Sequence, residues 1–120
     1  MPALQLTTNV KVADPKAFAL EFSKFSADIL GKPELYISVN YTYSETLTFG
    51  GTFDPAFTLS IFSLDNLSLE RNEVYSKGYF DFFKEKLGVA GNRGYVTFID
   101  PGRGFLGHQG TTFATIFGKS

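Results

Sequence analysis

The feature that most constrains the fold is an internal repeat with a period of roughly 57 to 59 residues. Each copy contains a strand-like segment, an amphipathic helix ending at glycine, and a second strand-like segment. Ile29-Leu30-Gly31 in the first copy corresponds to Lys86-Leu87-Gly88 in the second. Two β-α-β units can bury their apolar faces as one four-stranded mixed sheet with both helices on one face. The sequence therefore predicts a single α+β domain over residues 1–120, with pseudo-repeats at about 2–48 and 57–100 and a C-terminal tail.

Local signals give the bounds of the two helices. Asp14 followed by Pro15 is typical of a helix start, as is Ser68 in the second copy. Gly31 and Gly88 stand where a left-handed residue ends a helix. Helical spacing predicts that each helix buries one apolar face. These faces comprise Phe18, Phe22, Phe25 and Ile29 in the first helix, and Val74, Tyr75, Tyr79, Phe82, Phe83 and Leu87 in the second.

Four segments are rich in β-forming residues and bounded by turn residues. They are Ala3–Thr8, Tyr36–Tyr43, Phe57–Leu64 and Tyr95–Ile99. The tail, Gly102–Phe117, is Gly-rich with short apolar runs and too short for another layer. It suits small edge strands, which can pair with a neighbouring subunit.

The composition excludes several classes of function. The chain has no cysteine, so disulfides, thiolate metal sites and thiol redox chemistry are excluded, and its single His108 cannot build a histidine metal cluster. Neither a metal nor a cofactor is expected. Eleven basic residues nearly balance twelve acidic ones without a long basic tract, so nucleic acid is not an expected partner. The N-terminus lacks signal-peptide features and no stretch approaches ~20 apolar residues. The sequence thus predicts a cytoplasmic protein without membrane insertion, and leaves export by an unconventional route open.

A series of short motifs runs along the chain in a defined order. They include Met1-Pro2, Thr7-Thr8-Asn9-Val10, Gly31-Lys32-Pro33, Phe49-Gly50-Gly51, Asp54-Pro55-Ala56, Asn92-Arg93 and Gly110-Thr111-Thr112-Phe113-Ala114. Together they resemble the macrophage migration inhibitory factor and D-dopachrome tautomerase family over about residues 2–115. The resemblance implies a homotrimer with active sites at subunit interfaces, and keto-enol tautomerase activity of the phenylpyruvate or dopachrome type.

Pro2 is the general base that this resemblance implies. On its own, proline after methionine is an ordinary N-terminus that favours removal of Met1. Removal produces a free secondary amine, and an α-amino group titrates near ~8. Burial and a nearby cation both favour its neutral form, which can take a proton from a carbon next to a carbonyl. If Met1 stays, the nitrogen of Pro2 is an amide and has no basicity.

Lys32 is the expected electrostatic partner of this base. As a cation at a helix C-terminus it gains ~0.3–1 kcal/mol from the helix dipole. The resemblance implies in addition that it binds the carboxylate or enolate oxygen of the substrate. An aromatic, apolar wall beside one lysine suits a small aromatic keto or enol acid. The resemblance assigns the remaining substrate-binding positions, which by themselves also read as core or strand residues: Leu64, Tyr95, Thr97 and Phe113, with Tyr36 and Leu106 as further candidates.

The chain departs from the mammalian cytokine around this pocket. Thr97 replaces an asparagine, His108 replaces a tryptophan at the rim, and the Cys-x-x-Cys motif is absent. An alternative function is therefore a cytokine-like protein that acts through a receptor, with the tautomerase pocket vestigial or secondary. A third alternative keeps the fold but dehalogenates or decarboxylates unsaturated acids. Those reactions need an added carboxylate and arginine, for which Asp100 and Arg103 are the nearby candidates.

Overall fold

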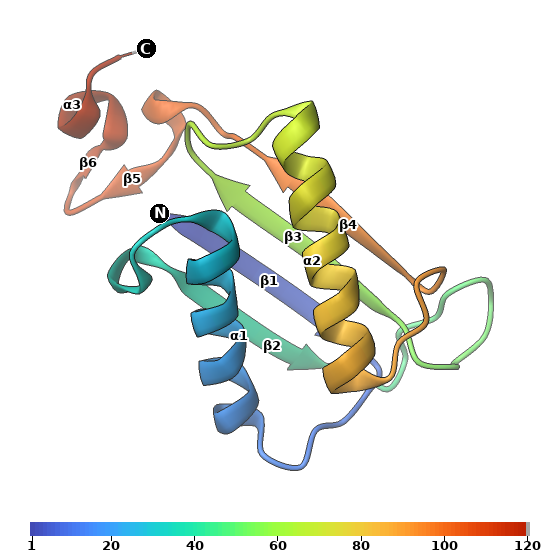
Figure 1. Cartoon of the computed structure of the whole chain (residues 1–120). Coiled ribbons are helices and arrows are strands. Elements are labelled where there is room, and N and C mark those ends of the chain that lie inside the picture. The colour runs from blue at the N-terminus through green and yellow to red at the C-terminus, as the bar shows by residue number, and fades with distance from the viewer. Residues whose placement is uncertain (120) are drawn as a thin grey trace.

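The computed structural model describes residues 1–119, which contain a four-stranded sheet covered on one face by two helices (Figure 1). The strands are β1 (Pro2–Thr8), β2 (Ser38–Tyr43), β3 (Phe57–Ser63) and β4 (Gly94–Ile99), in the spatial order β2-β1-β3-β4. β1 and β2 are parallel, as are β3 and β4, and β1 is antiparallel to β3. The predicted α+β fold, with a mixed sheet made from two β-α-β units, is confirmed.

The two long helices begin and end at the predicted residues. α1 (Pro15–Leu30) begins after Asp14, whose carboxylate accepts a hydrogen bond from the Ala17 amide at 3.1 Å. α2 (Leu69–Leu87) begins after Ser68, whose hydroxyl accepts from the Arg71 amide. Each helix ends at a glycine with positive φ, 66° for Gly31 and 69° for Gly88, because that conformation strains any residue with a Cβ.

The core lies between the helices and the covered face of the sheet. The inward residues of β1 and β3 alternate with exposed or half-buried ones, as a strand with one buried face requires. Aromatic rings from both helices interlock above them, for example Phe22 against Phe83 with centroids 5.6 Å apart. The helices approach closely at Gly78, where a Cβ would lie 2.0 Å from Ile29 Cδ1. The fully buried core side chains include Leu4, Leu6, Phe22, Tyr79, Phe83 and Ile61.

Two local predictions are wrong. Tyr36 does not begin a strand, because Glu34–Tyr36 forms a 3-10 turn (η1) in which the Tyr36 amide donates to the Pro33 carbonyl at 3.1 Å. β2 therefore starts at Ser38. Val74 is 64% exposed and does not belong to the buried face of α2, since it precedes Tyr75 by one residue and so points about 100° away from it.

The tail after β4 is more helical than the sequence suggested. It comprises η2 (Arg103–Phe105), β5 (Gly107–His108), β6 (Thr111–Thr112) and α3 (Phe113–Phe117). The two small strands are present and pair with each other in an antiparallel hairpin. A strand at Phe113–Phe117 is ruled out, since these residues form a short helix whose first side chain is buried. No helix within residues 1–119 has both the length and the hydropathy needed to span a bilayer.

Candidate active site

Pro2 occupies the start of the central strand β1, and its side chain is fully buried. In the ladder it lies opposite Ser63, the last residue of β3, while the next residue, Ala3, lies opposite Ser38, the first residue of β2. A proline fits at this position because the first residue of a strand can lack a ladder donor. Pro2, Ser38 and Ser63 mark one end of the strands, which we call the proline end of the sheet.

The amine and the lysine that the sequence singled out are electrostatically coupled. The structure contains Met1, so its N-terminal amine is that of Met1. This amine lies one residue before the Pro2 nitrogen, which becomes the N-terminal amine when Met1 is removed. Burial lowers the pKa of this amine below its ordinary value of 8.0, and the positive charge of Lys32 lowers it further. Lys32 is half-buried and directly follows the helix end at Gly31, and its backbone amide donates to the Ala27 carbonyl at 3.2 Å. Tyr36, which is 56% exposed, follows four residues later, just before β2 begins at the proline end.

The loop that follows β3 brings further groups to the proline end. Leu64 comes directly after Ser63 and is 3% exposed, so its side chain is packed in the protein. Asn66 is also buried, and its side chain accepts a hydrogen bond from the Ser63 hydroxyl and donates to the Leu30 carbonyl at 3.4 Å. Sequence reasoning did not identify Ser63 or Asn66, because no spacing or motif distinguishes them from other polar residues at a strand end.

The tail carries two predicted wall residues to the same end. Ile99 lies opposite Phe62, so the chain leaves β4 at the proline end, and the tail begins there (Figure 1). The Leu106 carbonyl accepts a hydrogen bond from the Phe113 amide at 3.0 Å. Phe113 is 6% exposed, and the His108 ring stacks on it with centroids 5.5 Å apart.

Asp100 and Arg103, the candidates for an additional reaction, fasten the tail instead. Arg103 forms an ion pair with Asp65 at 2.9 Å and donates to the Phe117 carbonyl at 3.0 Å. The carboxylate of Asp100 accepts from the backbone amides of Asp65 and Gly102 at 3.1 and 2.9 Å. Because these contacts use both side chains to join the tail to the loop after β3, they give no support to dehalogenation or decarboxylation.

Tyr95 and Thr97 lie away from the proline end of their own chain. Tyr95 is opposite Thr58 near the other end of the sheet, is 67% exposed, and packs against Phe49 with ring centroids 5.1 Å apart. Thr97 is exposed and lies opposite Ser60 in the middle of β4. Within this chain, Lys32 acts on the amine and Leu64 and the tail follow strands that end at the proline end, whereas Tyr95 and Thr97 lie away from that end.

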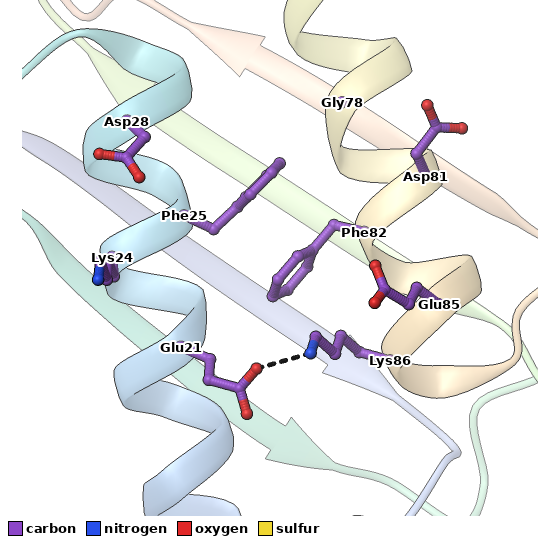
Figure 2. Close-up of a pocket in the computed structure, with 9 residues that line it drawn as sticks. All are labelled: Glu21, Lys24, Phe25, Asp28, Gly78, Asp81, Phe82, Glu85 and Lys86. Carbon is purple, nitrogen blue, oxygen red and sulfur yellow. Dashed lines mark ion pairs between the residues drawn. The ribbon is translucent and has the colours of Figure 1, made fainter.

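An open groove between α1 and α2 lies on the outer face of the helices (Figure 2). Phe25 and Phe82 stack at its floor with centroids 4.4 Å apart, and Lys86 forms an ion pair with Glu21 at 2.8 Å across it. None of the residues predicted for catalysis or substrate binding lines this groove. It is a solvent-exposed seam between two packed helices, separate from the proline end.

A sheet of two β-α-β units, with a buried proline at the start of a central strand and a cation beside the amine, defines a protein of the tautomerase superfamily. The chain belongs to the macrophage migration inhibitory factor family, since the model described as "Macrophage migration inhibitory factor (MIF)" matches residues 1–114.

Similar proteins agree over nearly the whole chain. Macrophage migration inhibitory factor homologs from Trichuris trichiura and Trichinella spiralis are 36% and 35% identical to it over 114 residues, which cover 94% of this chain and 100% of each relative. The solved structure of the Trichinella spiralis factor superposes with a TM-score of 0.86 at 34% identity, over 92% of this chain and 99% of that chain. The solved structure of a homologue from Prochlorococcus marinus superposes with a TM-score of 0.85 at 28% identity, over 92% of this chain and 98% of that chain.

Proposed function

We propose that this protein is a keto-enol tautomerase of the phenylpyruvate or dopachrome type, with the amine of Pro2 as its general base. The observation that carries the proposal is the environment of the chain start. Pro2 is fully buried, and both burial and Lys32 lower the pKa of the amine of Met1, the residue directly before it. An amine in this environment is neutral over more of the physiological pH range than an exposed one, which is the state that a base requires.

The reaction follows from these two groups. The neutral amine of Pro2 takes a proton from the carbon next to the substrate carbonyl, and the electron pair of that C–H bond moves onto the carbonyl oxygen. The Lys32 ammonium stabilises the enolate charge that develops there. Transfer of the proton from the Pro2 ammonium to the enolate oxygen, directly or through water, gives the enol and restores the neutral amine. In the reverse direction the amine takes up the proton released from the enol oxygen and delivers it to carbon.

The base exists only in a chain that has lost Met1, because an amide nitrogen cannot accept the proton. The test measures enol-to-keto conversion of phenylpyruvate and of a dopachrome ester by protein whose intact mass shows that Met1 is absent. We expect conversion well above the buffer rate, and a large loss in Pro2→Gly, whose primary amine is not oriented by a ring. A processed wild-type protein without activity, or an unchanged rate in Pro2→Gly, would falsify the proposal.

We infer the substrate class from the apolar residues expected to line the pocket. Leu64, Leu106 and Phe113 are apolar and Lys32 is the cation beside the amine, which suits a flat acid whose carboxylate or enolate oxygen binds the ammonium. We therefore expect phenylpyruvate to be converted more efficiently than pyruvate, which lacks the ring. Equal efficiency with the two acids would show that the wall does not bind the substrate.

We also propose that the complete site forms in a homotrimer. Tyr95 and Thr97 cannot complete the pocket of their own chain, but an exposed Tyr95 on the edge strand β4 can extend into the pocket of a second copy. Exposed apolar side chains elsewhere, such as Leu35 at 84% and Phe105 at 87%, support burial against another subunit. Light scattering tests the oligomeric state, and we expect the mass of three chains.

A mixing experiment tests whether the pocket is shared. Pro2→Gly and Tyr95→Ala protomers are each impaired, but co-assembly at equal amounts places an intact Pro2 and an intact Tyr95 in about one quarter of the pockets. We expect co-assembled trimers to be more active than the average of the two parent variants. Strictly additive activity would show that Tyr95 serves no neighbouring site.

A receptor-binding function is the alternative, and the altered pocket periphery at Thr97 and His108 favours it. In this case the fold acts as a cytokine-like ligand, and the tautomerase pocket is vestigial or secondary. This function requires that the protein reaches the outside of the cell. Cell binding or a cell response that survives Pro2→Gly would support this function, while loss of both activity and response in that variant would support action through the pocket.

A further inference from the structure

One buried residue joins the three elements that meet behind the proline end. Asn66, which is 6% exposed, lies in the loop between β3 and α2. Its carboxamide oxygen accepts from the Ser63 hydroxyl at the end of β3, and its carboxamide nitrogen donates to the Leu30 carbonyl at the end of α1. The Tyr75 hydroxyl of α2 donates to the backbone carbonyl of Asn66 at 2.9 Å and so holds the loop from behind.

Each of these contacts leads directly to a group of the proposed site. Ser63 lies opposite Pro2 in the β1–β3 ladder. Leu30 is the last residue of α1, and its carbonyl is one of the four at a helix end that have no partner within the helix. Only Gly31, in the left-handed conformation, separates Leu30 from Lys32. The position of the Leu30 carbonyl therefore determines where the side chain of Lys32 begins.

We propose that Asn66 is a positioning residue that holds the Lys32 turn against the strand end that carries Pro2. This inference rests on the proposed tautomerase function. Asn66 touches neither group itself and acts through Leu30 and Ser63. The attraction or repulsion between two charges varies with their separation, so a looser turn weakens the influence of the Lys32 ammonium on both the amine and the developing enolate. An asparagine with only a structural role would donate to the Leu30 carbonyl without affecting the pKa of the amine or the stability of the enolate.

The test compares Asn66→Leu, which keeps the size of the side chain but removes both hydrogen bonds, with the processed wild-type protein. NMR of ¹⁵N-labelled proline reports the pKa of the Pro2 amine directly, without depending on activity. We expect this pKa to rise toward the ordinary value of an α-amine. We also expect kcat/KM for phenylpyruvate to fall roughly tenfold, since small displacements of catalytic groups are costly, and its acidic limb to move to higher pH. Ser63→Ala breaks only one of the two contacts, and we expect a smaller change in the same direction, which keeps the inference testable if Asn66→Leu folds poorly.

Ser26→Ala is the matched control. Ser26 and Tyr79 are fully buried and join α1 to α2 through a 2.9 Å hydrogen bond, so this variant also leaves a buried polar group unpaired, but away from the site. We expect it to lower stability and to leave the amine pKa and the rate unchanged. If Ser26→Ala changes the amine pKa as much as Asn66→Leu does, the effect of Asn66 comes from a general loss of rigidity in the fold, and the inference is overturned.

A double-mutant cycle shows whether Asn66 acts through Lys32. If it does, Asn66→Leu has little further effect on the amine pKa in a Lys32→Ala background. Additive effects, or an unchanged pKa in Asn66→Leu alone, overturn the positioning role whatever the rate. A wild-type protein without tautomerase activity, whose amine pKa nevertheless responds to Asn66→Leu through Lys32, rejects the proposed function and leaves the positioning role standing.

Discussion

The end of the sheet opposite Pro2 is held by two polar side chains, Asn9 and Arg93, whose hydrogen bonds go to backbone groups. Asn9 donates to three carbonyls and accepts from one amide, all within residues 47–56. Arg93 donates to three carbonyls of the same segment. The proline end uses Asn66 in a similar way, but there a partly buried titratable amine feels the charge of Lys32. Similar supports therefore have different consequences: at one end they order a loop, and at the other we expect them to control the ionisation of a base.

Retention of Met1 should have the largest effect on activity. It removes the base from the proline end and leaves the opposite end of the sheet unchanged. Protein expressed without methionine aminopeptidase keeps the nitrogen of Pro2 as an amide. We expect its phenylpyruvate tautomerase rate to fall by roughly 10²–10⁴, the usual contribution of a general base. Intact mass and circular dichroism on the same sample verify the extra residue and the unchanged fold. Comparable rates in the two forms would rule out the amine as the base.

Removal of the cation is the next largest change. In Lys32→Ala we expect kcat/KM to fall by roughly 10²-fold, since a group that stabilises developing oxyanion charge is lost. The active amine is neutral, so activity is present above its pKa and is lost as pH falls through that pKa. Burial and Lys32 lower the pKa of the N-terminal amine, so loss of the charge moves this limb to higher pH. Lys24→Ala, an exposed lysine on α1, is the control and should leave the pH–rate profile unchanged.

The sequence predicted much of the fold because its signals are local. Asp14, Ser68, Gly31 and Gly88 each form the helix end that the residue type favours. Wrong predictions arose where neighbouring contacts decide the conformation, as at Tyr36, whose strand-like side chain lies in a 3-10 turn after proline.

Several motifs that appeared separate in the sequence prove to be one structural unit. Asn9 and Arg93 bind the segment that contains Phe49-Gly50-Gly51 and Asp54-Pro55-Ala56, so these motifs order a loop rather than carry chemistry. In contrast, Asn66 could not be found from the sequence. Its importance depends on the three-dimensional approach of Asn66 to Leu30 at the end of α1, 36 residues earlier in the chain, and no local pattern encodes that approach.

Asn9→Ala tests the end opposite Pro2 alone. Loss of its four backbone contacts leaves the Ala56 amide without its partner, and we expect the free energy of unfolding to fall by about 1–3 kcal/mol. The amine pKa should stay as in the wild type, because Asn9 is at the other end of the sheet. Denaturant unfolding and proline NMR measure the two quantities. Asn92→Ala, an exposed asparagine at the same end, should change stability by less than about 0.5 kcal/mol.

The smallest expected effect concerns the tail, whose attachment to the proline end depends on Arg103. Arg103→Ala removes the ion pair with Asp65 and the bond to the Phe117 carbonyl, which loosens the wall that carries Phe113. We expect the KM for phenylpyruvate to rise by roughly threefold, equivalent to about 0.6 kcal/mol of binding, with little change in kcat. Lys77→Ala breaks an exposed ion pair on α2 and should alter neither constant. A fall in kcat at constant KM would instead place Arg103 in the reaction itself and revive the proposal of a different chemistry on this fold.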